Sequence, residues 1–125
     1  MTVSNIYKQN LILVFLILLS GVISSQNIEF KSSNFKRDKV GFKLAKQNIS
    51  IADEIRKNGI DRILENQDAH SIFTEAVFYY NKAQYFNPDN AELNYKIGSS
   101  LLFTNQKERA YEYLLRAKEL NAELP

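Results

Sequence analysis

The amino-acid sequence predicts an all-α fold of antiparallel helical hairpins that stack into a short solenoid. Residues 74–88, moved forward by 34 places, fall on residues 108–122 with small, bulky and polar positions in step. Apolar residues also recur at helical spacing, and a period of this length is typical of a hairpin that buries its apolar face only against a neighbour. The matching pairs are Ala76 with Ala110, Tyr79 with Tyr113, Tyr80 with Leu114, Ala83 with Ala117, Phe86 with Leu120 and Asn87 with Asn121.

The chain begins with the pattern of a secretory signal peptide. Lys8 precedes an uncharged apolar run over residues 11–19, and the small residues Ser24 and Ser25 follow it. A membrane anchor is the competing interpretation, but a spanning helix needs about 20 apolar residues and this run is shorter. We predict a signal peptide over residues 1–25, cleaved after Ser25 or alternatively after Ser24. The protein is then exported, to the periplasm or the outer membrane, and touches a membrane only through this segment if it is uncleaved.

Composition narrows the function classes. The chain has no cysteine, which excludes a lipid-modified bacterial lipoprotein and leaves packing without disulfides to stabilise a domain of about 100 residues. The net charge of +2 is too small to indicate nucleic-acid binding. Charge is uneven, however: residues 31–62 carry nine basic and four acidic side chains, and residues 63–125 carry six basic and nine acidic. A solvated helix face explains this imbalance, and a docking surface for an acidic partner is the alternative.

Residues 26–37 are polar and lack an apolar period, so we predict a linker or loosely held arm. Residues 38–58 then have the apolar spacing of one helix face, and Gly59 supplies a helix stop. Residues 60–66 could add a further turn or two, which residues 66–68 interrupt. The predicted face consists of Leu44, Asn48, Ile51, Ala52 and Ile55.

A second helix is predicted over residues 71–87. It ends at Asn87-Pro88 because proline cannot continue a helix. Its predicted inward residues are Phe73, Ala76, Tyr80, Ala83 and Phe86.

Two further helices are marked by capping-box patterns, Asp89 with Glu92 and Asn105 with Glu108. The first ends near Thr104, and the short polar link after it makes the two helices antiparallel. Gly98 costs about 1 kcal/mol relative to alanine inside a helix, which indicates that another backbone comes close there. The facing residues are Leu93, Ile97, Gly98 and Leu101 on one helix and Ala110, Leu114, Ala117 and Leu120 on the other, with Ala110 and Ala117 as the expected neighbours of Gly98.

These features make residues 91–122 resemble a tetratricopeptide repeat, and residues 71–90 resemble the second helix and exit turn of a preceding one. The family's early aromatic is replaced by Asn94 and its closing proline by Ala122. The resemblance implies a first repeat over residues 38–90. In this repeat Ile51-Ala52 corresponds to Ile97-Gly98, and an inserted loop over residues 59–70 separates the two helices. An uninterrupted register would put Ile63-Leu64 there instead, where leucine is too large for a close approach.

A narrower resemblance rests on residues 87–98 behind a signal peptide. This string is similar to the amino-terminal repeat module of Bacteroidetes-type cell-envelope proteins, which often continue into a peptidoglycan-binding domain of the outer-membrane-protein-A type. The last helix would keep an uncovered apolar side at Pro125, so the sequence is expected to be a fragment of a longer relative.

Little in the sequence can carry chemistry, and we predict no enzyme, no catalytic residue, no metal and no cofactor. His70 is the one histidine and is expected in a surface loop without a second metal ligand. Asp53 and Glu54 are adjacent, so on a helix they diverge and cannot share a proton. No phosphate-binding or nucleophile motif occurs. The aromatic residues near Phe78 have helical spacing, which favours packing over base stacking and again argues against nucleic acid.

The expected function is therefore protein or peptide binding through the groove that such repeats form with their first helices. The resemblance implies that it is lined by Lys46, Ile49, Asp53 and Arg56 in the first repeat and Tyr95, Ser99, Leu102 and Phe103 in the second. Ile49 and Asp53 stand where chaperone-tail-binding members hold a terminal carboxylate with lysine and asparagine, which disfavours that partner class. Two hypotheses follow: a periplasmic or cell-envelope scaffold that helps assemble an envelope or secretion complex, and an amino-terminal fragment or spacer of a peptidoglycan-tethered outer-membrane protein.

Overall fold

The computed structural model describes residues 26–125, and the predicted signal peptide lies outside them. In chain order the elements are a short 3₁₀ helix η1 (Ser32–Phe35) and the α-helices α2 (Lys39–Leu64), α3 (His70–Phe86), α4 (Ala91–Leu101) and α5 (Lys107–Leu120). The described residues contain no strand, which confirms the all-α prediction. None of the helices in residues 26–125 is long and apolar enough to cross a membrane.

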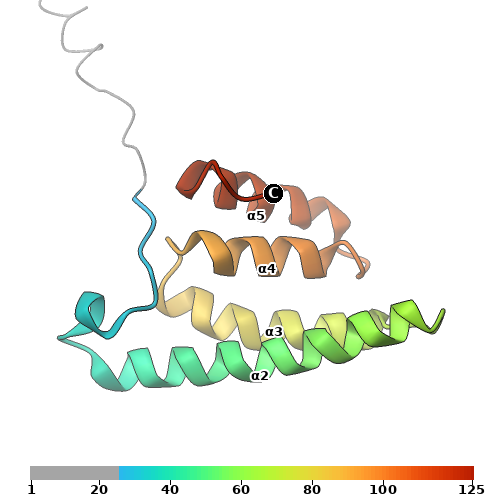
Figure 1. Cartoon of the computed structure of the whole chain (residues 1–125), viewed down its shortest axis with the longest axis horizontal. Helices are drawn as coiled ribbons and strands as arrows, with labels where there is room; N and C mark the ends of the chain where they lie inside the picture. Colours follow the sequence, from blue (N-terminus) through green and yellow to red (C-terminus); the bar gives the residue numbers. More distant parts are fainter. Residues whose placement is uncertain (1–25) are drawn as a thin grey trace, which may run out of the picture.

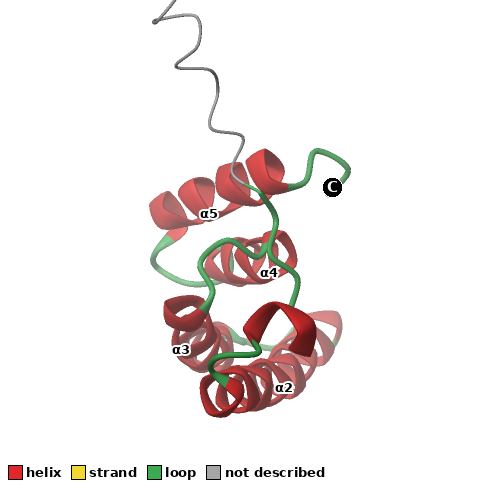
Figure 2. Cartoon of the chain, turned by 90° about the vertical axis from the view of Figure 1, so that its left-hand side faces the viewer, coloured by secondary structure: helices red, strands yellow, loops and turns green. Residues whose placement is uncertain are grey.

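The four α-helices lie alongside one another in chain order (Figure 1). Each packs on the next, so the hairpins α2–α3 and α4–α5 stack through α3 and α4. Seen along the helices, α3 lies to one side of α2 and α4, and α5 crosses above α4 (Figure 2). The first helix of each hairpin therefore contributes to one common face.

Small residues let neighbouring helices approach closely. The buried residues of α2 are Ala45, Ala52 and Gly59, at intervals of seven. A Cβ atom added at Gly98 in α4 would lie 2.7 Å from Cγ of Leu114 and 3.1 Å from the carbonyl oxygen of Ala110 in α5. The predicted close approach at Gly98 is confirmed with Ala110 as its neighbour, whereas Leu114 and not Ala117 supplies the other nearest atoms.

The predicted helix stop at Gly59 is wrong, because α2 continues to Leu64. A Cβ atom at Gly59 would lie 2.9 Å from Cε2 of Phe73, so glycine here makes room for an aromatic ring of α3. The helix ends instead where Asn66 adopts the left-handed conformation, with φ of 57°. The inserted loop over residues 59–70 is therefore also wrong, and only residues 65–69 separate the two helices.

The buried face of α2 is also rotated relative to the prediction. Ala45 lies in the core whereas Leu44 is 55% exposed, since the helix turns its small residues toward α3. Ala52 is fully buried and Leu64 is 75% exposed. This burial agrees with the register that places Ile51-Ala52 at the close approach and disagrees with the one that places Ile63-Leu64 there.

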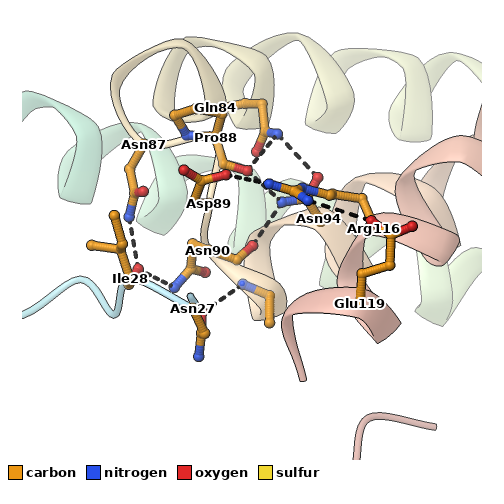
Figure 3. Close-up of polar contacts among 11 residues, drawn as sticks. Asn27, Ile28, Gln84, Asn87, Pro88, Asp89, Asn90, Asn94, Arg116 and Glu119 are labelled. Carbon is orange, nitrogen blue, oxygen red and sulfur yellow. Dashed lines mark hydrogen bonds and ion pairs between the residues drawn. The ribbon is translucent and has the colours of Figure 1, made fainter. Parts of the chain in front are cut away.

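The segment before α2 is not loosely held, contrary to the prediction. The backbone N–H of Ile28 donates to the carbonyl of Asp89 at 2.7 Å, and the side-chain amides of Asn87 and Asn90 both donate to the carbonyl of Ile28, at 2.8 and 3.0 Å. Oδ1 of Asn27 accepts from the N–H of Ala91 at 2.9 Å (Figure 3). We call residues 26–31 the arm; it is fixed to the turn between α3 and α4.

A cluster of four phenylalanine rings also holds the arm and η1 against α2 and α3. Phe35 of η1 packs against Phe42 of α2 and Phe86 of α3, with ring centroids 5.5 and 5.0 Å apart. Phe30 of the arm packs beside both Phe35 and Phe86, with ring centroids 5.9 and 6.5 Å away. Periodicity within one helix cannot reveal this cluster, because separate elements supply its rings.

Both predicted capping boxes are wrong in detail. The residue that caps α4 is Asn90, one position after Asp89, and its Oδ1 accepts from the N–H of Leu93 at 2.8 Å. At α5 the capping position is Gln106, whose side chain caps nothing, while Oγ1 of Thr104 accepts from the N–H of Gln106 at 3.1 Å. Helix α4 also ends earlier than predicted, at Leu101.

Replacing Asn90 with alanine is expected to lower the free energy of unfolding by about 1–2 kcal/mol. The variant loses the cap on Leu93 and one of the two amides that hold the arm at Ile28. Thermal melting measures the loss. Asn105→Ala is the matched control, because Asn105 is exposed and caps no helix; an equal loss in both variants would contradict this account of the cap.

Candidate functional site

The common face of α2 and α4 is hollowed where the arm meets it. A hollow of about 570 Å³ is lined by Lys46, Ile49 and Asp53 of α2, by Lys96 and the first turn of α4, and by parts of the arm and of the segment after α5. We call the face between α2 and α4 the groove. It brings together residues from both hairpins, so its shape depends on how the hairpins stack.

Asp53 ties three helices together beside this hollow. Its Oδ1 accepts from the hydroxyl of Tyr80 at 2.6 Å, and its Oδ2 accepts from Nζ of Lys96 at 2.9 Å. Lys96 also pairs with Glu92, one turn earlier in α4, at 3.0 Å. These contacts fix α2, α3 and α4 relative to one another at the groove.

Asn94 organises the far side of α4, where a family member would carry an aromatic residue. It is buried, and its Nδ2 donates to the carbonyls of Pro88 and Asn90 at 2.9 and 2.8 Å. Its Oδ1 accepts from Nε2 of Gln84 at 3.0 Å (Figure 3). The side-chain amide of Asn94 thus forms hydrogen bonds with the carbonyl groups of the turn between the hairpins. A hydrocarbon ring could not form them.

The same turn is held from α5. Nη2 of Arg116 donates to Oδ1 of Asp89 at 2.6 Å, and its Nη1 donates to Glu119 at 3.3 Å. Asp89 therefore serves as an ion-pair partner across the two hairpins and not as the cap that the sequence pattern suggested.

The comparison with protein families found one similarity, and it falls on the second hairpin. A family model described as tetratricopeptide repeat matches residues 91–124. A tetratricopeptide repeat is thus detected over the α4–α5 hairpin. Repeats of this family generally mediate protein–protein interaction and are typically non-catalytic scaffolds. Comparison with curated proteins and with solved structures gave no match. The narrower resemblance to Bacteroidetes-type cell-envelope proteins is thus supported by no relative, and the first repeat over residues 38–90 stays a prediction.

The structure brings six of the eight predicted groove residues onto one side. Lys46, Ile49, Asp53 and Arg56 follow one another along α2, and Lys46, Ile49 and Asp53 line the hollow. In the tetratricopeptide repeat, Ser99 faces Arg56 across the groove, and half-buried Tyr95 lies one turn earlier in α4. Leu102 lies beyond the last turn of α4 and is 45% exposed.

Phe103 does not face the groove, and its predicted role there is wrong. Its ring stacks on Phe73 of α3, with centroids 4.6 Å apart and an interplanar angle of 22°. The reason is that α4 has already ended at Leu101, so the backbone turns at residues 102–104 and directs Phe103 toward α3.

Sequence reasoning missed two groove features. Lys96 was not singled out, although it follows Glu92 by one turn and precedes Ser99 by three residues on the same side of the repeat's first helix. The arm was missed because its contacts join backbone groups of Ile28 to asparagine side chains about 60 positions away, a pairing that no local pattern indicates.

His70 has a structural role that the predicted surface loop did not include. It is the first residue of α3, is half-buried, and its Nε2 accepts from the N–H of Asn105 at 3.2 Å. It thereby joins the start of α3 to the loop inside the tetratricopeptide repeat. Within residues 26–125, no group of three or more histidine, cysteine, aspartate or glutamate residues could hold a metal ion.

Two protonation equilibria are shifted at the groove. Burial, reinforced by the hydrogen bond to Asp53, raises the pKa of Tyr80 well above its ordinary value of 10.0. Burial lowers the pKa of Lys96, but its hydrogen bonds to Asp53 and Glu92 outweigh that effect, so the pKa of Lys96 lies above its ordinary value of 10.5. Both groups thus keep their protons more firmly in the folded chain than in the unfolded chain.

The folded chain is therefore expected to lose stability in alkali. A folded-state pKa raised above the unfolded value contributes stability that is complete below the unfolded pKa and is lost as pH rises through the folded pKa. The melting temperature should thus fall as pH rises above about 10, where Tyr80 and then Lys96 would ionise in the unfolded chain. Tyr80→Phe removes the first group and should make the fall shallower. The same slope in both proteins would contradict the expectation.

Proposed function

We propose that the chain is a non-enzymatic protein-interaction module whose groove holds a peptide segment of a partner protein. The observation that carries the proposal is the pairing of Asp53 with Lys96 at 2.9 Å, which makes α2 and α4 one face beside the hollow. That hollow, of about 570 Å³, is within the range of sites that enclose small ligands and can take a few side chains of a peptide. The tetratricopeptide repeat at residues 91–124 supports a protein as the partner class.

We propose further that this module is exported and helps assemble a complex of the periplasm or cell envelope. Three features of residues 1–25 support export: the positive charge of Lys8, the short apolar run over residues 11–19, and the small residues Ser24 and Ser25 that follow it.

A second candidate is a fragment or spacer of a peptidoglycan-tethered protein related to outer-membrane protein A. The string over residues 87–98 favours it. The DNA after the codon for Pro125 discriminates between the two: a continuing or directly following frame that encodes a wall-binding domain supports the spacer, and its absence supports the scaffold.

Site-specific photo-crosslinking tests the groove. A photoreactive phenylalanine analogue replaces Tyr95, half-buried in the groove, or Tyr85, which is 94% exposed on α3. In the host cell, we expect position 95 to capture a discrete protein adduct that position 85 does not. Adducts that are identical at both positions, or confined to position 85, would overturn the proposed function.

A further inference from the structure

We infer that the partner segment held in the groove is acidic, a refinement that rests on the proposed function. Residues spaced by three and four lie on one face of a helix, and the α2 residues that continue the groove face in this way are mostly cationic. They are Lys39, Lys43, Lys46, Ser50, Asp53 and Lys57. The uneven charge of the sequence is thus concentrated on the face that forms one wall of the groove.

The acidic groups already present at this face are largely engaged. Asp53 accepts a hydrogen bond from Tyr80 and forms an ion pair with Lys96, and Lys96 forms a second ion pair with Glu92. By contrast, no lysine or arginine of α2 forms an ion pair within residues 26–125, and those on or beside the groove face are Lys39, Lys43, Lys46, Arg56 and Lys57. Glu54 is the one further carboxylate beside Lys46 and Lys57 in a second hollow of this face. A surplus of positive charge is therefore left for a ligand.

Of these cations, Arg56 is the strongest candidate to bind a carboxylate of the partner. It is half-buried, its Nε is buried without a hydrogen-bond partner, and its Nη2 reaches only Ser99 Oγ, at 3.5 Å. A partly buried guanidinium without a carboxylate partner is costly, because its desolvation is not offset. A carboxylate from a ligand would offset it with charge-assisted, two-point hydrogen bonds. Arg56 is thus poised as an anchor for an acidic side chain.

The mixture of groups favours a peptide over a nucleic acid or a lipid surface. Glu29 and Glu92 line the hollow with Lys46 and would repel a continuous polyanion. Ile49 and Phe30, which also line the hollow, offer apolar contact between the charges. A segment whose carboxylates alternate with neutral side chains matches this pattern better than evenly spaced phosphates.

Fluorescence anisotropy tests the inference with the full chain and a labelled peptide of alternating glutamate and serine. We expect binding that weakens as salt is raised and that is absent for the glutamine–serine peptide. Arg56→Met should weaken binding at least about tenfold while leaving the melting temperature unchanged or raised, a combination that a merely structural arginine would not give. Lys118→Met on α5 removes the same charge from an exposed site away from the groove and should leave binding unchanged.

Three outcomes would overturn the inference: no binding of the glutamate peptide, equal binding of the glutamine peptide, or equal loss in the Arg56 and Lys118 variants. Tighter binding of a single-stranded oligonucleotide or of phosphatidylglycerol vesicles, with the same dependence on Arg56, would also overturn it. The two proposals fail separately. A Tyr95 crosslink to a segment without aspartate or glutamate removes the acidic class and leaves the interaction function, whereas crosslinks confined to Tyr85 remove the function itself.

Discussion

Replacing Ala110 with phenylalanine is expected to abolish the folded state. Ala110 is fully buried, and its carbonyl oxygen lies 3.1 Å from the position that a Cβ atom would occupy at Gly98. A phenyl ring at this contact must push α5 away from α4, and overpacking of this kind costs about 3 kcal/mol or more. A small domain has only about 5–10 kcal/mol of stability in total, and separating the helices would also expose the core between them. Circular dichroism melting should show no cooperative transition.

The neighbouring position supplies the control for this prediction. Tyr111 is 69% exposed, so Tyr111→Phe should change the free energy of unfolding by no more than about 0.5 kcal/mol. If Ala110→Phe melted at the temperature of the parent chain, α4 and α5 could not lie as close as the structure places them.

Replacing Asn94 with leucine is expected to lower the free energy of unfolding by about 2–4 kcal/mol, although leucine has the higher helix propensity. The variant removes the amide donors to the carbonyls of Pro88 and Asn90 and the acceptor of Gln84. Asn94 is 1% exposed, so water cannot replace these partners without opening the turn. Urea denaturation measures the loss.

Asn58→Leu is the matched control for this substitution, because Asn58 lies on α2 and is exposed. It should stay within about 0.5 kcal/mol of the parent chain. A stabilised Asn94→Leu variant would mean that the turn between the hairpins does not need the amide, and that an apolar residue fits there as it does in the family.

Sequence periodicity predicted the helices whose apolar residues repeat. The inward face of α3 was predicted: its four other inward residues are buried, and Phe86 packs partly buried against the core, where Phe30 and Phe35 cover it. The contact between Gly98 and Ala110 was predicted because a glycine inside a helix and an alanine at the matching position of the next helix together indicate close packing. These features are local to one helix or recur at a fixed distance, which is why the amino-acid order contains them.

Features that depend on a neighbouring element were not predictable in the same way. Gly59 is typical of a helix end, and only the ring of Phe73 reveals that it marks a close approach. Asp89 and Asn90 are both good caps, and the choice between them depends on Arg116, which draws Asp89 toward α5. The groove residues that lie within α2 and α4 were predictable from helical spacing. Phe103 was misplaced because α4 ends before it reaches that residue.

The central claim is that the two hairpins stack so that α2 and α4 form a single face, and a double-mutant cycle between Asp53 and Lys96 tests it most directly. The two residues are 43 positions apart in sequence, and their charged groups lie 2.9 Å apart. Asp53→Asn, Lys96→Met and the double variant are compared by urea denaturation. We predict a coupling free energy of about 1 kcal/mol, because the pair is partly shielded from solvent. Strictly additive losses would contradict the shared face, and with it the groove on which the proposed function depends.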